Sequence, residues 1–425
     1  MALCWKTDGK DASAHAKFLI DDMKQYLSIS QDNIVSARMG AFEFSADALY
    51  GFVEPKYSMD ASLLFDKFKK AILDTFKEGR GDIDGNRLLK IFEKDCASSL
   101  SKKNVYFLIT SVNISSVETP INRVIDGCEI IFHKKLPLEF EKSRIDLISE
   151  IPNKLNISCD NDDYLYVSIK VSATEHLTAF SMAMKVFDIY RGLMQIYFVK
   201  KTRFSLSDVV IRYDSDCVLR PGNIHTLHLP DGNRAVDCYW TEDVANLSPP
   251  RNIVKFGRAD ENVSIAISKL GVAKRPYFDL CAKSIINYVL AISKEDLESR
   301  FMSLWLCLEL ITNSDDADGV IKRVTFFFGN PNVEKATLRA LRKARNSQVH
   351  AGVIPLNLEM KNFRLCSFVD SMLIYLIHNH YEFDNPQDFF DFMSCSTDID
   401  SIDKQISRLE LVKKFIEKSS VDVLV

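Results

Sequence analysis

The chain has 425 residues, of which 47% are hydrophobic and 26% charged, and its formal net charge is −4 at pH 7. This composition is that of a folded globular protein, and the length exceeds what one hydrophobic core usually organises, so two or three domains are expected. The pI of about 6.1 excludes nucleic-acid binding through the whole surface, so such a contact would require a local basic patch.

Ten cysteines are spaced singly between Cys4 and Cys395, without a CxxC pair. Secreted domains that depend on disulfides cluster their cysteines, so we expect reduced thiols and a cytoplasmic location. The N-terminal sequence MALCWKTDGKDASAHAKF lacks the apolar run of a signal peptide, and no segment approaches the roughly 18 apolar residues of a membrane helix. We therefore expect no membrane partner.

The first 240 residues are predicted to be α+β. Residues 11–97 carry apolar side chains at helical spacing, for example Leu64, Phe68 and Ile72. The segment HLTAFSMAMKVFDIYRGLMQIYF (176–198) predicts one long buried helix. Four segments rich in β-branched and aromatic residues predict strands: 104–114, 128–133, 163–171 and 208–213.

A polar segment with two adjacent prolines, NLSPPRNIVKFGRADEN (246–262), separates the strand-rich sequence from a purely helical one. It predicts a domain boundary near residue 258. The first domain (1–258) would be a sensor or recruitment region, and it could divide further into a helical part (1–97) and a strand-rich part (98–258). The second domain (259–425) would be all-α, a helical bundle followed by C-terminal helices.

Four helices are predicted in the second domain from apolar residues at helical spacing. Short to moderate connections between such helices favour an antiparallel four-helix bundle. The four predicted ranges are about 276–292, 296–312, 334–350 and 363–381.

The third of these helices carries two stripes of side chains. Leu338, Leu341, Arg345 and Val349 share one face, which places an arginine in an apolar stripe, where an unpaired charge is costly. Glu309, at the margin of the apolar face of the preceding helix, is a candidate partner for it. The other stripe is polar and consists of Lys335, Arg339, Arg342, Asn346 and His350.

Residues 334–350 hold five basic side chains against the single acid Glu334. Guanidinium groups suit phosphate, so the surface could bind a phosphate-bearing ligand. Spacing alone fits better a solvated helix face, on which His350 only interacts with the helix dipole. The five basic residues are Lys335, Arg339, Arg342, Lys343 and Arg345.

The sequence RNSQVH (345–350), closely followed by Gly352, resembles the Arg-x-x-x-x-His motif of HEPN-domain ribonucleases. LWLCLEL (304–310) resembles the second bundle helix of the Apea-like branch of that superfamily, and the resemblance covers roughly residues 265–382. It implies a HEPN-like four-helix bundle, a homodimer, and a metal-independent RNA endonuclease that uses no cofactor. It also implies a role in anti-phage or abortive-infection defence, with an unknown trigger that acts at the N-terminal region and could be phage-derived.

Carried over residue by residue, the resemblance assigns phosphate binding to Arg345, proton transfer to His350 and positioning to Asn346, with Glu309 orienting Arg345. RNA binding falls to Lys335, Arg339, Arg342 and Lys343. Arg345 and His350 are roughly 140° apart on a straight helix, so their convergence requires helix termination, the reach of arginine, or a second protomer. The alternative is a non-catalytic HEPN module that binds RNA, a nucleotide or a partner protein.

Four other patterns are set aside. GRGDIDGNRLLKIF (79–92) lacks carboxylates at the first and twelfth positions of a calcium loop, so it predicts a turn between helices. HTLH (225–228) has no nearby residues to complete a metal site. The tripeptide at 378–380 (HNH) predicts a solvated helix end whose two histidines do not face each other, and NSDDADG (313–319) predicts a loop.

Overall fold

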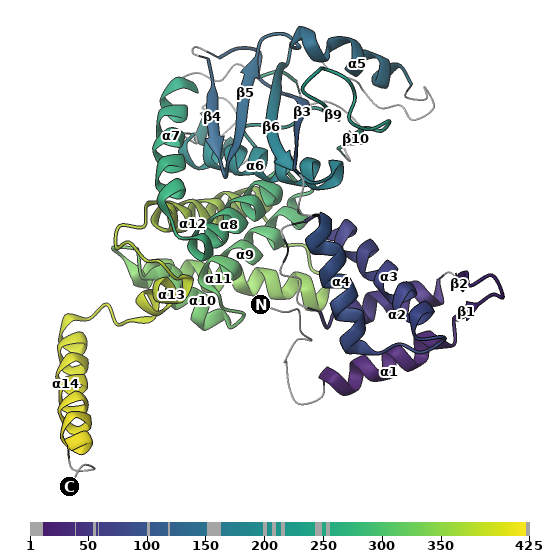
Figure 1. The fold of residues 1–425 in the computed structure, drawn as a ribbon. Helices are drawn as coiled ribbons and strands as arrows, with labels where there is room; N and C mark the ends of the chain where they lie inside the picture. Colours follow the sequence, from purple (N-terminus) through teal and green to yellow (C-terminus); the bar gives the residue numbers. More distant parts are fainter. Residues whose placement is uncertain are drawn as a thin grey trace.

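The computed structural model describes residues 12–421 except residues 39, 54–56, 58, 100–102, 118–119, 151–162, 199–201, 206–209, 214–216, 243–248 and 252–255. The protein is a mixed α/β molecule with three parts (Figure 1): a helical N-terminal unit, an antiparallel sheet with its helices, and a helical C-terminal region. Among the described helices, none combines the length and the apolar composition needed to cross a bilayer.

The N-terminal unit forms its own hydrophobic core. Its buried side chains, from Ala16 to Cys96, cluster separately from the rest of the protein, and Phe68 packs edge-on against Phe92. A turn joins α3 to α4, as the sequence 79–92 predicts. The elements are α1 (Ala12–Lys24), β1 (Leu27–Ile29), β2 (Val35–Ala37), α2 (Ala41–Tyr50), α3 (Ala61–Glu78) and α4 (Gly85–Ser99).

The central sheet has the strand order β10-β9-β3-β6-β5-β4, and every pairing in it is antiparallel. All four predicted strand segments contain a strand. The elements of this part are β3 (Asn104–Val112), β4 (Asn122–Ile125), β5 (Cys128–His133), α5 (Leu138–Ser149), β6 (Leu165–Ala173), α6 (His176–Tyr197), β7 (Thr202–Ser205), β8 (Val210–Tyr213), β9 (Ile224–His228) and β10 (Trp240–Thr241).

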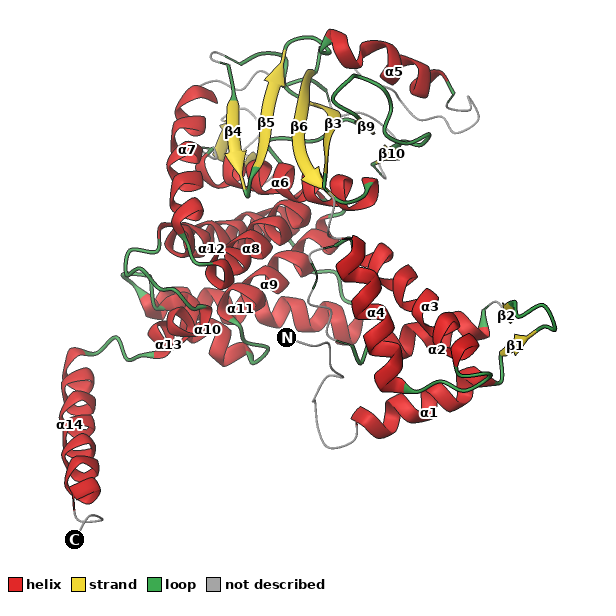
Figure 2. Ribbon diagram, in the orientation of Figure 1, coloured by secondary structure: helices red, strands yellow, loops and turns green. Residues whose placement is uncertain are grey.

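Helix α6 is buried along most of its length because it lies between the sheet and the C-terminal helices (Figure 2). At Gly192 it approaches α8 so closely that an added Cβ would lie 2.4 Å from Ile285 Cγ2. This confirms the predicted long buried helix and shows why its apolar residues occupy more than one face.

The C-terminal region contains the four predicted helices, in which α9 packs against both α8 and α12. Helices α13 and α14 follow the bundle, where C-terminal helices were expected, whereas α7 and α10 were not predicted. Helix α10 begins inside the acidic segment 313–319, where Asp316 caps it by accepting from the Gly319 N–H. The elements are α7 (Phe256–Val272), α8 (Arg275–Ser293), α9 (Leu297–Thr312), α10 (Ala317–Thr325), α11 (Pro331–Ala351), α12 (Leu358–His378), α13 (Pro386–Ser394) and α14 (Ile399–Val421).

The domain boundary predicted near residue 258 does not separate two hydrophobic cores. One continuous cluster of buried side chains extends from Tyr106 in the sheet to Met393 in α13. It is continuous because α6 contributes one side to the sheet and another to α8. Among the described residues, the break between this cluster and that of the N-terminal unit lies between Cys96 and Tyr106.

Candidate functional site

Helix α11 carries the Arg-x-x-x-x-His motif, and its ends follow from local sequence. Pro331 occupies the first turn, where its missing N–H is not needed. Gly352 ends the helix in the left-handed region at φ 62°, and its N–H donates to the Gln348 carbonyl at 3.0 Å. The glycine therefore places His350 in the last turn of the helix, with its side chain exposed.

A shallow groove of about 500 Å³ lies along α11. Three of the four predicted RNA-binding residues line it, together with Asn346 and His350, whereas Lys335 does not. Asp318 of α10 is the one acid among the lining residues, against three basic side chains, so the lining is mainly cationic. The lining residues are Asp318, Arg339, Arg342, Lys343, Asn346, Ser347, His350 and Ala351.

Arg345 is not part of the lining of this groove. It is half-buried, and its Nη1 donates to Asn346 Oδ1 at 3.3 Å. Its Nε is buried and has no hydrogen-bond partner among the residues that the structure describes. A single copy therefore brings His350 and Asn346 together in the groove but keeps Arg345 on a neighbouring face, as the roughly 140° separation predicts.

The predicted apolar stripe of α11 is shorter than its sequence suggests. Leu338 and Leu341 are buried against the bundle, but Val349 is 48% exposed. Arg345 therefore lies where the buried face gives way to the exposed end of the helix. This position explains how a charged side chain is tolerated there.

Glu309 is not the partner of Arg345 within the described part of the chain, which corrects the prediction. Its Oε1 accepts a hydrogen bond from Nε1 of the buried Trp305 at 2.7 Å. The carboxylate of α9 that reaches α11 is Glu298, whose Oε2 accepts from Gln348 Nε2 at 3.1 Å. Helical spacing could not identify this contact, because it depends on how two helices cross.

No protein-family model, curated protein or solved structure matches this chain. The interpretation of the α11 site therefore depends on the motif and the geometry of the helix.

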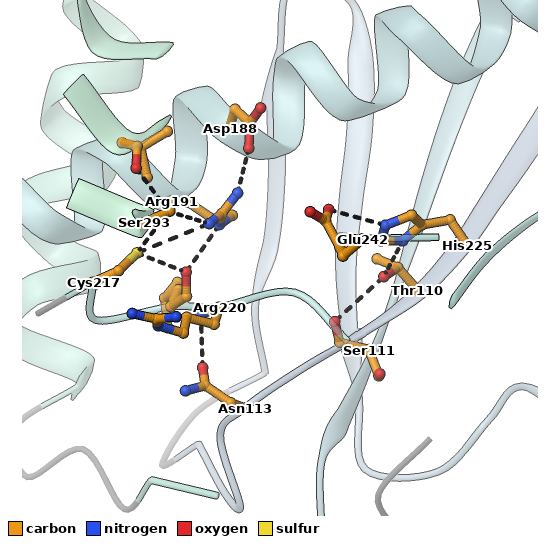
Figure 3. Close-up of polar contacts among 12 residues, drawn as sticks. Thr110, Ser111, Asn113, Asp188, Arg191, Cys217, Arg220, His225, Glu242 and Ser293 are labelled. Carbon is orange, nitrogen blue, oxygen red and sulfur yellow. Dashed lines mark hydrogen bonds and ion pairs between the residues drawn. The ribbon is translucent and has the colours of Figure 1, made fainter. Parts of the chain in front are cut away.

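A second concentration of polar side chains is buried beside the sheet (Figure 3). His225 on β9 bonds Thr110 Oγ1 through Nδ1 at 2.7 Å and Glu242 Oε1 through Nε2 at 3.1 Å. The hydrogen bond with His225 and the attraction of Arg191 lower the pKa of Glu242, although burial alone would raise it. Both ring nitrogens of His225 therefore have partners, Thr110 on β3 and Glu242 directly after β10. The described residues contain no group of three potential ligands that could hold a metal.

Arg191 of α6 lies at the centre of the same buried region (Figure 3). Its guanidinium pairs with Asp188, and burial raises the pKa of that carboxyl against the attraction of the arginine. Arg191 also donates to the Leu219 carbonyl at 2.9 Å and to Ser293 Oγ at 3.0 Å. Because these groups come from different segments, the network joins α6 to the end of α8 and to the chain preceding β9. The charged groups of the network, Arg191 and Asp188, have each other and neighbouring polar groups as partners, which gives them a structural role.

The two histidines of the tripeptide at 378–380 face each other, contrary to the prediction. Helix α12 ends at His378, so His380 lies in the following turn and its ring stacks on that of His378 at 5.5 Å. His378 Nε2 also bonds the Tyr197 hydroxyl at 3.2 Å. Burial, with smaller contributions from His380 and Lys269, lowers the pKa of His378. These contacts give the pair a packing role at the junction of α6 and α12.

Proposed function

We propose that this protein is a metal-independent RNA endonuclease of the HEPN type, acting in anti-phage or abortive-infection defence. The observation that supports the proposal is the groove on α11, in which His350 and Asn346 lie beside Arg339, Arg342 and Lys343. A groove of this kind suits a sugar-phosphate backbone, because each guanidinium can donate two hydrogen bonds to one phosphate.

The chemistry available to these side chains is intramolecular transesterification. The RNA 2′-hydroxyl oxygen attacks the adjacent phosphorus, the bond from phosphorus to the 5′ oxygen breaks, and a 2′,3′-cyclic phosphate and a 5′-hydroxyl result. Imidazole is suited to moving protons near neutral pH, which assigns this role to His350. Arg345 stabilises the negative charge that develops on the phosphoryl oxygens.

A homodimer completes the site in this proposal. Arg345 and His350 occupy neighbouring faces of one α11, so one copy does not present both to the same phosphate. Two-fold pairing is the commonest closed symmetry of soluble oligomers, and it would bring Arg345 of one copy toward the groove of the other.

The trigger is proposed to act at the N-terminal region. A cavity of about 210 Å³ lies where this unit meets the sheet and the bundle, and Asp60, Ser181, Lys185 and Arg275 are among the residues that line it. A molecule bound there would contact all three parts of the protein.

The test is incubation of the purified protein with total RNA in EDTA, comparing wild type, His350→Ala and His380→Ala. His380 is an exposed histidine outside the groove, so its replacement is the matched control. We expect cleavage by wild type and His380→Ala and none by His350→Ala. Cleavage by all three would show that the site is elsewhere.

A non-catalytic HEPN module that holds RNA, a nucleotide or a partner protein is the second candidate. The observation that favours it is the separation of Arg345 from the groove in one copy. Retention of RNA by the wild type without cleavage, weakened by Arg339→Ala, would support this candidate over the enzyme.

A further inference from the structure

The last helix, α14, exposes a large apolar surface. It extends away from the rest of the protein (Figure 1) over 23 residues, a length of roughly 34 Å. Most of the stability of a helix in a protein comes from packing of its apolar face, and an exposed apolar face on such a helix marks an interaction site. Seven of its large hydrophobic side chains are between 49% and 72% exposed: Ile399, Ile406, Leu409, Leu411, Val412, Phe415 and Ile416.

Most of these side chains follow a heptad pattern. The spacings alternate between three and four residues, as in the a and d positions of a coiled coil. Lys413 takes one a position, and a single lysine there is a known means of specifying register and oligomer state at a cost in stability. The stripe consists of Ile399, Ile402, Ile406, Leu409, Lys413 and Ile416.

The two flanks of the stripe differ in charge. Asp403, Glu410 and Glu417 follow one edge at seven-residue intervals, which are e positions. The opposite edge, at the g positions, is uncharged at Gln405 and Val412 within the helix and carries a charge only at Asp398, directly before it. In a parallel pair the e positions of one helix face the g positions of the other. In an antiparallel pair the e positions of one helix face the e positions of the other, which would place the two acidic rows together. Parallel pairing therefore avoids repulsion between the two acidic rows.

The same acidic row argues against a lipid surface as the occupant. Helices that lie in a membrane interface are rich in lysine and arginine on the polar face, whereas α14 carries four acids beside five basic residues. Anionic lipids would repel the three acids that flank the stripe, Asp403, Glu410 and Glu417. A second copy of the same helix matches the stripe in length, in periodicity and in the placement of its charges.

We propose that α14 pairs with α14 of a second copy to form a parallel two-stranded coiled coil. The pairing does not depend on ribonuclease activity. It would nevertheless hold two α11 helices at high effective concentration, as the composite site of the proposed function requires.

The first test measures the mass of the full chain by light scattering across concentration, for wild type, Leu409→Glu and Leu411→Glu. Leu409 lies in the stripe, whereas Leu411 is an equally exposed leucine on the opposite side of the helix. We expect wild type and Leu411→Glu to dimerise alike. Leu409→Glu should raise the dissociation constant by roughly 100-fold, because it buries two unpaired carboxylates.

The second test determines the direction of the two helices. In a Cys395→Ser background, Leu409→Cys should form a disulfide-linked dimer on mild oxidation, since identical d positions meet only in a parallel pair. Leu411→Cys is the control and should link poorly.

A monomeric wild type, or a dimer that Leu409→Glu leaves intact, overturns the proposal. Sedimentation of wild type but not Leu409→Glu with anionic vesicles would also overturn it, in favour of a lipid surface. If Leu409→Glu loses the dimer but still cleaves RNA, the pairing of α14 stands, and the composite dimer site of the proposed function is refuted.

Discussion

Replacing Gly192 by alanine tests whether the sheet and the helical bundle share one core. The new Cβ would lie 2.4 Å from Ile285 Cγ2 and 3.0 Å from the Ile285 carbonyl oxygen. Ile285 is fully buried, so α6 and α8 must separate or repack, and overpacking of this kind costs about 1–3 kcal/mol. Alanine also favours the helix by about 1 kcal/mol relative to glycine. We therefore expect a net loss of about 0–2 kcal/mol in the free energy of unfolding.

Gly271 in α7 provides the matched control. It is exposed, and an added Cβ there meets no atom within 4 Å, so Gly271→Ala changes helix propensity without steric conflict. The difference between the two variants isolates the steric cost, which should be about 1–3 kcal/mol. Urea denaturation would measure it in variants that retain either Trp240, next to the sheet core, or Trp305, in the bundle, as the fluorescent probe.

A shared core predicts that Gly192→Ala lowers the midpoint of both tryptophan transitions by the same amount. Two results would refute the reasoning. One is a Gly192→Ala protein as stable as Gly271→Ala. The other is a lowered transition for Trp240 with an unchanged transition for Trp305, which would restore a domain boundary near residue 258.

Three further predictions follow from buried polar groups. Burial and the nearby Arg144 lower the pKa of His228 to about 4 from its ordinary value of 6.5, so its native form is neutral. The free energy of unfolding should therefore fall as the pH drops from 6.5 to 4, by at most about 3 kcal/mol, and His228→Gln should remove this part of the pH dependence in denaturation curves. Arg345→Met should abolish RNA cleavage yet leave the melting temperature unchanged or higher, because it removes a buried unpaired Nε; a strongly lowered melting temperature would contradict this. Glu309→Ala should destabilise by about 1–3 kcal/mol because it leaves the Trp305 N–H unpaired, whereas Glu309→Gln, which keeps an acceptor, should change the midpoint little.

The elements that periodicity predicts well are those whose apolar pattern is long. The long helix from His176 and the bundle helices α8, α9 and α12 carry several turns of apolar residues, and the structure contains each of them. It also contains α11, whose buried face is limited to Leu338 and Leu341. Helix α10 was missed because its start lies in an acidic segment, where composition favours a loop and only the capping by Asp316 marks a helix. A polar linker near residue 258 marks a change of secondary structure, but it does not reveal that the apolar faces on its two sides meet.

In the candidate site, too, sequence spacing predicts the arrangement within one helix but not the contacts between helices. Helical spacing alone predicts that Arg339, Arg342, Asn346 and His350 share a face, and the structure places all four along one groove. Spacing does not predict the contact of Gln348 with α9, because this depends on the crossing of two helices. It also cannot determine the partner of a half-buried side chain, which is why Glu309 was assigned wrongly.

The separate core of the N-terminal unit has a consequence for how this protein can change over evolutionary time. The unit meets α6 through hydrogen bonds, in which Asp60 accepts from the Ser181 hydroxyl and its N–H donates to Thr178 Oγ1 at 3.4 Å. Polar contacts of this kind can be rebuilt by a few surface substitutions, whereas a shared apolar core requires compensating changes on both sides. The N-terminal unit can therefore diverge, or be exchanged for another small domain, more readily than the sheet and the bundle can be separated.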